Sequence, residues 1–82
     1  MHTPTLERSA LGQHRVVSAV LVPPDSPQWA RWLDEIGFIP GEHVVVTARA
    51  ALGGDPLVVR VGQSTFALRR AEAACVHLQP AT

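Results

Sequence analysis

Apolar residues along this chain fall into short segments that are separated by glycine, proline and small polar residues. Five segments have the composition and length of strands; they cover residues 14–22, 43–50, 57–61, 64–68 and 75–78. One segment differs, because Trp29, Leu33 and Ile36 recur at helical spacing with Trp32 beside them. The pattern therefore predicts a mainly β domain with one inserted α-helix over about residues 26–36.

Both ends of the predicted helix carry residues that commonly start or stop helices. Ser26 is the expected N-cap, since its hydroxyl can accept a backbone N–H, and Pro27 suits the first helical position. Gly37 follows the last apolar residue and is expected to adopt the left-handed conformation that ends many helices. Phe38 is then placed to contact Leu33. These signals predict a helix with defined ends.

Tight turns are expected after the helix. The segment 39–42 fits a type II turn, with Pro40 at its second position and Gly41 at its third, where φ must be positive. Gly62 opens a two-residue loop, which favours a type II′ hairpin. A short helical turn is expected near residues 70–74. We interpret the proline and the glycines as structural residues that aim the strands.

A chain of 82 residues is long enough for one compact core. Residues 13–79 are expected to form that single domain. Residues 1–12 fit an irregular lead-in, and residues 80–82 fit a frayed tail. Five short strands and one helix within so few residues favour a small barrel, which removes exposed sheet edges by closing on itself.

Charge and cysteine content narrow the classes of function. Seven arginines balance seven acidic residues, there is no lysine, and the net charge is zero. The chain therefore lacks the basic field expected of a nucleic-acid-binding protein. Cys75 is the single cysteine, which excludes an internal disulfide. No segment has the pattern of a signal peptide or the length of a membrane span, so we expect a cytoplasmic protein without direct membrane insertion.

Candidate metal ligands are present, but none belongs to a paired motif such as C-x-x-C or H-E-x-x-H. We considered His2, His14, Glu42, His43, Cys75 and His77. Cys75 is expected to be a small buried hydrophobe, which leaves the histidines and the glutamate as weak surface candidates. We therefore expect no dedicated metal site and no required cofactor. Adventitious surface binding of zinc or ferrous iron stays open.

Catalytic chemistry has little support in the sequence. Ser64 and Thr65 have no nearby His–acid partner, so no set of nucleophile, base and orienting residue can be named. The Gly-Gly-Asp segment that ends at Asp55 lacks the lysine of a phosphate-binding loop. We therefore expect that the protein is not an enzyme.

Three stretches in sequence order resemble the FeoA family of bacterial ferrous iron transport. They are LDEIGFIPGEHVVV, ALGGDPLVVRV and STFALRRAEAACV, within residues 33–76. The resemblance implies an SH3-like β-barrel with an inserted helix. It also implies a non-catalytic regulatory role beside a FeoB-type permease, a membrane protein with a cytoplasmic GTP-binding domain that would recruit this chain to the inner membrane.

Candidate partner-binding residues lie on the helix, in the corner after it and in the loop near residue 53. They are Trp29, Trp32, Phe38, Gly41, Leu52 and Asp55. The helix carries two tryptophans, and if one packs inward the other lies about 60° away at the rim; tryptophan is enriched among residues that dominate binding energy. Two alternatives stay open, a carrier of ferrous iron or another transition metal and a generic SH3-like adaptor, as does weak self-association.

Overall fold

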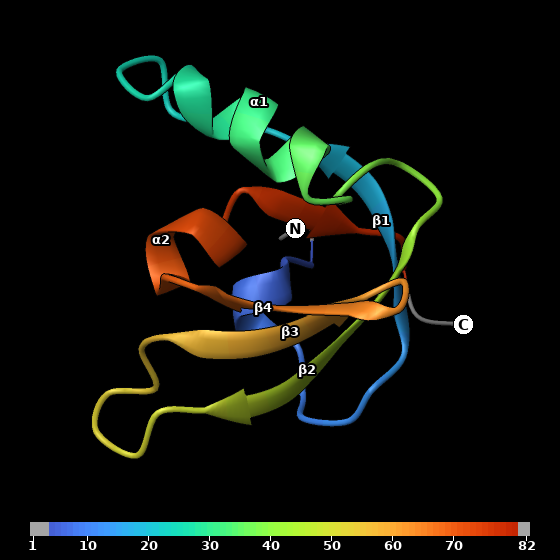
Figure 1. The fold of residues 1–82 in the computed structure, drawn as a ribbon, viewed down its shortest axis with the longest axis vertical. Helices are drawn as coiled ribbons and strands as arrows, with labels where there is room; N and C mark the ends of the chain where they lie inside the picture. The colour runs from blue at the N-terminus through green and yellow to red at the C-terminus, as the bar shows by residue number, and fades with distance from the viewer. Residues whose placement is uncertain (1–3, 81–82) are drawn as a thin grey trace.

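In the computed structural model, which describes residues 4–80, five antiparallel strands form one sheet with the spatial order β4-β3-β2-β1-β5. The strands are β1 (Arg15–Val20), β2 (His43–Arg49), β3 (Leu57–Val61), β4 (Ser64–Leu68) and β5 (Val76–Leu78). The helices are α1 (Gln28–Glu35), α2 (Arg70–Ala73) and the short 3-10 helix η1 (Leu6–Arg8) (Figure 1). The mainly β fold with an inserted helix is confirmed. The expected lead-in and tail fall partly outside the described residues.

The sheet bends around its core without closing. Irregularities interrupt the pairing of β1 with β5 between Val17 and Ala19, and that of β2 with β3 between Val46 and Ala48; such bulges bend a strand and increase its twist. Within residues 4–80 no ladder joins β4 to β5, and the chain passes from one to the other through α2. The expectation that closure removes both sheet edges was therefore wrong, because a helix occupies the connection where the last pairing would form.

The N-terminal segment covers the outer edge of β5. The carbonyl of Pro4 accepts a 2.8 Å hydrogen bond from the N–H of Leu78, and Thr5 forms an isolated bridge to β5. Leu6 is fully buried in the core. The expectation of an irregular lead-in over residues 1–12 was thus wrong for its described part, because this segment supplies a core side chain and completes the hydrogen bonding of a strand.

Two arginines tie the N-terminal segment to the rest of the domain. A guanidinium nitrogen of Arg49, on β2, donates to the backbone carbonyls of Glu7 and Ser9. Arg70, on α2, forms a 2.9 Å ion pair with the side chain of Glu7. Both guanidinium groups therefore hold the N-terminal segment against the sheet and α2.

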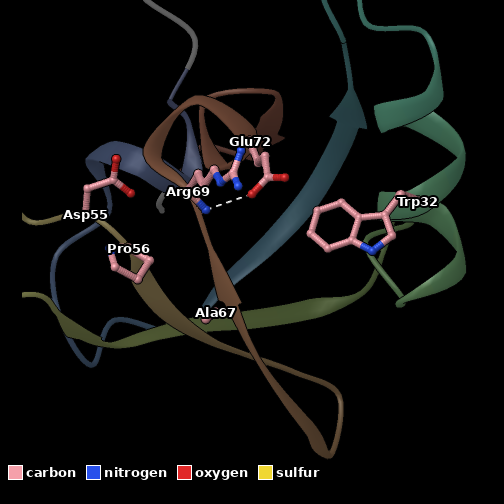
Figure 2. A pocket seen from close by; sticks show the side chains of 6 residues that line it. All are labelled: Trp32, Asp55, Pro56, Ala67, Arg69 and Glu72. Atoms are coloured by element: carbon pink, nitrogen blue, oxygen red, sulfur yellow. Dashed lines mark hydrogen bonds between the residues drawn. The ribbon is translucent and has the colours of Figure 1, made fainter.

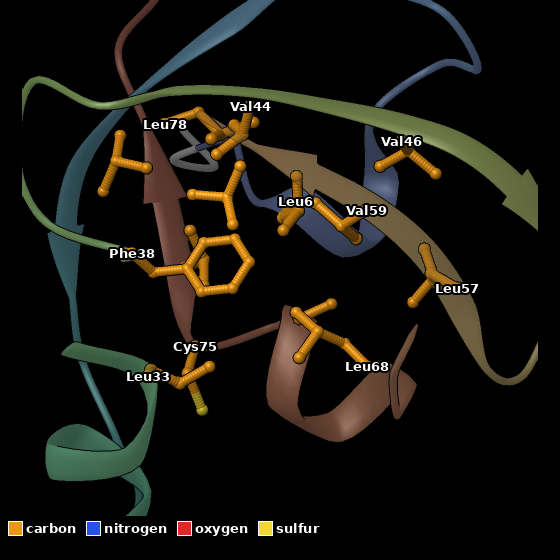
Figure 3. Close-up of a cluster of buried hydrophobic side chains, with 14 residues drawn as sticks. Leu6, Leu33, Phe38, Val44, Val46, Leu57, Val59, Leu68, Cys75 and Leu78 are labelled. Atoms are coloured by element: carbon orange, nitrogen blue, oxygen red, sulfur yellow. The ribbon is translucent and has the colours of Figure 1, made fainter. Parts of the chain in front are cut away.

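One hydrophobic cluster fills the concave side of the sheet (Figure 3). Every second residue of β3 points into it, with Leu57, Val59 and Val61 buried and Arg60 exposed. This period-two pattern is typical of a strand with one face in the core. The other buried hydrophobic residues are Leu6, Val17, Leu33, Phe38, Val44, Val46, Leu68, Ala73, Cys75, Val76 and Leu78.

Helix α1 begins without the expected side-chain cap. Among residues 4–80 no side chain caps its N-terminus, and the backbone carbonyl of Ser26 instead accepts a 3.1 Å hydrogen bond from the N–H of Trp29. Pro27 has helical angles, with φ −64° and ψ −25°, so the ring that fixes φ starts the helical path. The expectation for the Ser26 hydroxyl was wrong, because its carbonyl satisfies the donor instead.

The corner after α1 sets the direction of β2. The N–H of Glu42 donates to the carbonyl of Ile39 at 3.0 Å, and Gly41 has φ +92°, which are the features of a type II turn. The N–H of Gly41 also donates to the carbonyl of Val17 at 2.8 Å. This bond fixes the corner against β1, and β2 leaves the corner paired with that strand.

Candidate functional site

A hollow of about 620 Å³ lies between α1, the loop after β2 and the end of β4. It is lined by Trp32, Asp55, Pro56, Ala67, Arg69 and Glu72. Figure 2 shows Trp32 on one side of the hollow and Asp55 with Pro56 on the other, with Ala67 between them. Residues that are far apart in the sequence therefore share one surface.

Backbone contacts hold the two carboxylates of the hollow in place. Asp55 accepts a 3.1 Å hydrogen bond from the backbone N–H of Arg70, and Glu72 accepts a 2.8 Å bond from that of Arg69 (Figure 2). In each case one carboxylate oxygen is used, and the second has no hydrogen bond within residues 4–80. With Arg69 as the third charged group, the hollow has two negative charges and one positive charge.

Trp32 supplies the large apolar side of the hollow. Neither Trp29 nor Trp32 is fully buried; both are half-buried and pack against the core from outside. Leu33 is the α1 side chain that enters the core completely. The sequence left open whether one tryptophan ring packs inward; neither does so completely, because Leu33 fills that position, and both rings keep surface for contact.

The remaining predicted partner-binding residues are dispersed. Leu52 is 91% exposed in the loop after β2, and Gly41 is exposed in the corner before β2. Phe38 is 1% exposed, so its assignment as a partner-binding residue was wrong; the ring fills the core beneath α1 (Figure 3). Of the six candidates, only Trp32 and Asp55 line the hollow.

Four lining residues were not identified from the sequence. Pro56, Ala67, Arg69 and Glu72 come from the loop after β2, from β4 and from the segment around α2. A signal was available for one of them, since an acidic residue three positions after a helix start commonly accepts a hydrogen bond from the residue at that start. Glu72 does this for Arg69. The places of Pro56, Ala67 and Arg69 at the hollow depend on the curvature of the sheet.

A second hollow, of about 550 Å³, brings two metal-ligand candidates together. His14 and His43 both line it, beside Arg60. Glu42 lies next to His43 in sequence, and its carboxylate accepts a 3.1 Å bond from the backbone N–H of His43. His77 lies on β5 and is not among the lining residues. Among residues 4–80, no group of three or more His, Cys, Asp and Glu side chains is arranged to hold a metal ion; His2 lies outside that range.

Cys75 lies in the two-residue segment that joins α2 to β5. It is 4% exposed, and its Sγ is 3.4 Å from the carbonyl oxygen of Ala71, where the thiol can donate. Burial, with a smaller contribution from the negative charge of Glu72, raises the pKa of the Cys75 thiol. A thiol with a raised pKa is a poor nucleophile and a poor metal ligand at neutral pH.

The curved five-stranded sheet with helices at its open side defines a small SH3-like barrel domain. The family model described as FeoA domain matches residues 5–80. The chain belongs to the FeoA family. No curated protein matches the chain significantly.

Solved structures show the same fold. A FeoA of Stenotrophomonas maltophilia, crystallised with zinc, is 39% identical; the match covers 93% of this chain and 89% of that one, with a TM-score of 0.84. Iron(II) transport protein A of Clostridium thermocellum is 28% identical over 93% of this chain and 44% of that one, with a TM-score of 0.78. FeoA of Chlorobium tepidum is 27% identical over 92% and 68%, with a TM-score of 0.77. Within residues 4–80, no helix has the length and hydrophobicity needed to cross a membrane.

Proposed function

We propose that this protein is a non-catalytic accessory protein of ferrous iron uptake that acts by contact with a FeoB-type GTP-binding permease. Membership of the FeoA family supports the link to iron uptake. The Stenotrophomonas maltophilia relative has itself been suggested as a bacterial ferrous iron transport activating factor. In this proposal the chain works in the cytoplasm and reaches the inner membrane through its partner.

The observation that carries this proposal is the half-buried Trp32 beside the charged side chains of the hollow. An aromatic anchor with polar groups around it is the usual composition of a binding centre. The contact area is expected to be small, because regulatory contacts often bury less than about 1,200 Å² in total. Much of the affinity would then depend on one or two side chains. Leu52, exposed in the neighbouring loop, is a candidate for the rim.

The test compares single variants of the intact protein for binding to the isolated cytoplasmic part of the permease. Trp32→Ala is expected to weaken binding about thirtyfold, which corresponds to about 2 kcal/mol. Trp29→Ala should have a smaller effect, because that ring does not line the hollow. Leu11→Ala is the matched control, since Leu11 is 57% exposed and lines neither hollow. If both tryptophan variants fold and bind like the parent, the contact face lies elsewhere.

A second candidate function is transport of the ferrous ion itself, favoured by the meeting of His14 and His43 in the second hollow. Two imidazoles are fewer than the ligands of a closed site, so we expect weak binding of ferrous iron or zinc. Anaerobic calorimetric titration with ferrous iron, on the parent and on His43→Ala, separates the two functions. Tight stoichiometric binding that His43→Ala abolishes would favour the carrier.

A further inference from the structure

The two edges of the sheet differ in how they are protected. The outer edge of β5 is covered by Pro4 and Thr5, whereas β4 is the last strand on the opposite side. Strand β4, with the sequence STFAL, contains no charged residue and no proline, and its pairing with β3 runs without a bulge. A charged side chain, a proline and a β-bulge are common protections of an exposed sheet edge. Strand β4 has none of the three.

The register of the hairpin shows which backbone groups of β4 face outward. Val61 and Ser64 flank the two-residue loop, so they form a hydrogen-bonded pair, and pairs then alternate along the ladder. The N–H of Gly62 points toward β2, where it donates to the carbonyl of His43 at 3.2 Å, in agreement with this alternation. Thr65 and Ala67 therefore direct their N–H and C=O groups away from β3.

The outward groups end at the hollow described above. Ala67 lines the hollow, and Thr65 precedes it by two residues on the same edge. Neither residue has a backbone hydrogen bond on its outer side within residues 4–80. The next outward N–H, that of Arg69, is already satisfied by the carboxylate of Glu72. The open edge is therefore short, with two donors and two acceptors, and Trp32 lies across the hollow from Ala67 (Figure 2).

We propose that this edge binds an extended segment of a partner protein, which adds to the sheet as a strand beside β4. The outward N–H and C=O groups of Thr65 and Ala67 can be paired by a segment in the β conformation whose own backbone N–H and C=O groups are unpaired. Trp32 limits the space beside the edge. A single strand therefore suits the site better than the edge of a second copy of the barrel, in which β3 and the rest of the sheet would follow the edge strand. This inference rests on the proposed function in taking the permease as the source of the segment.

The charges of the hollow specify a side chain of that segment. Asp55 and Glu72 each have a free carboxylate oxygen in the hollow that Trp32 also lines, against the single positive charge of Arg69. A net negative site beside an indole ring favours a cation, which the ring face and the carboxylates both attract. The segment is therefore extended, free of proline at the pairing positions, and carries an Arg or Lys that reaches Trp32.

Hydrogen exchange of the intact protein provides the first test. Overlapping ten-residue peptides from the cytoplasmic part of the permease serve as probes. At saturation, one peptide is expected to slow exchange of the Thr65 and Ala67 amides by about tenfold or more, since they become hydrogen-bonded. The Phe66 amide, already paired with Val59, should change little. Binding that shifts side-chain signals without protecting these two amides would overturn the proposal.

Backbone methylation of the binding peptide provides the second test. Replacing each N–H by N-methyl in turn should weaken binding about tenfold or more at alternate positions, which face β4, and little at the positions between them. A uniform pattern overturns strand addition. In the protein, Ala67→Pro removes one outward donor and should weaken binding, whereas Ala67→Val keeps the donor and should not. The peptide series keeps the proposal testable if Ala67→Pro fails to fold.

Two further outcomes separate this inference from the proposed function. If the whole cytoplasmic part of the permease binds the parent and Ala67→Pro equally well, and no peptide protects Thr65 and Ala67, the edge is not the site and the proposed function stands. If a peptide protects these amides while the whole part does not bind, the edge stands and the proposed partner is wrong. Protection that rises with protein concentration alone would identify a second copy of the chain as the occupant.

Discussion

The backbone N–H of Phe38 donates a 2.9 Å hydrogen bond to the carbonyl oxygen of Leu33 across the end of α1. A second bond, 3.1 Å from the N–H of Gly37 to the carbonyl of Asp34, completes the Schellman motif, in which a left-handed residue ends the helix. The side chains of Leu33 and Phe38 are both buried, at 0% and 1% exposure. The same few residues therefore end the helix and fill the core below it.

Replacing Gly37 tests the backbone conformation of this motif. Gly37 has φ +114°, and a Cβ placed there would lie 3.5 Å from Val61 Cγ2, an ordinary contact. The cost of Gly37→Val should therefore come from the backbone, and we expect a loss of about 1–2 kcal/mol in the free energy of unfolding. Urea denaturation measures it. Ser18→Val, at an exposed position of β1, is the control, and equal stability of the two variants would contradict the assignment.

Truncating Phe38 tests whether its role is structural. Because the ring is buried, we expect Phe38→Ala to lower the free energy of unfolding by about 3–5 kcal/mol. Phe66→Ala should cost less, since that ring is only half-buried. Both are measured by urea denaturation of the intact chain. A stable Phe38→Ala variant that loses permease binding would instead restore Phe38 as a contact residue.

Truncating Leu6 tests the place of the N-terminal segment in the core. We expect Leu6→Ala to cost about 2–5 kcal/mol in the free energy of unfolding, because the side chain is fully buried. Leu11→Ala, at a 57% exposed side chain nearby in sequence, should stay within about 0.5 kcal/mol of the parent. Chemical denaturation compares the two. Similar small effects would show that the segment is only loosely attached.

The thiol of Cys75 should react slowly in the folded protein. Burial raises its pKa, so little thiolate is present at neutral pH, and the reagent has poor access. The folded state favours the neutral form of the thiol. The contribution of Cys75 to the free energy of unfolding is therefore complete below the pKa of the unfolded state, and it is lost as the pH rises through the higher pKa of the folded state. Labelling with a thiol reagent, native against urea-unfolded, measures the protection. Equal rates in the two states at neutral pH would contradict it.

Local signals in the sequence account for much of this fold. The apolar spacing of α1, the glycine that ends it and the Pro40–Gly41 turn depend on neighbouring residues only, and each was identified. The hairpin also follows the expectation, since Gly62 has φ +58° and no described residue other than glycine has a positive φ, as a type II′ turn requires. The burial of Leu6 could not be predicted in this way, because its partners come from distant strands.

The site shows the same division. Trp32 and Asp55 were identified from residue type and loop position, but their meeting with Ala67 in one hollow depends on how far the sheet curls. Burial excludes Phe38 from any contact surface, although its aromatic side chain suggested one. The contacts of Arg49 and Arg70 with Glu7 could not be predicted from local sequence either. Arg49 is 42 residues from Glu7 in the chain, and Arg70 is 63 residues from it.

The covered edge of β5 also sets a limit on assembly. Growth of a β-fibre by repeated addition of identical subunits requires that each subunit offer one edge and accept another. Here Pro4 and Thr5 occupy the edge of β5, so a chain that pairs through β4 has no second open strand edge among its described residues to offer to the next chain. Pairing at β4 therefore adds one strand to the sheet and stops there. The protein in this way avoids polymerisation although the edge of β4 remains open.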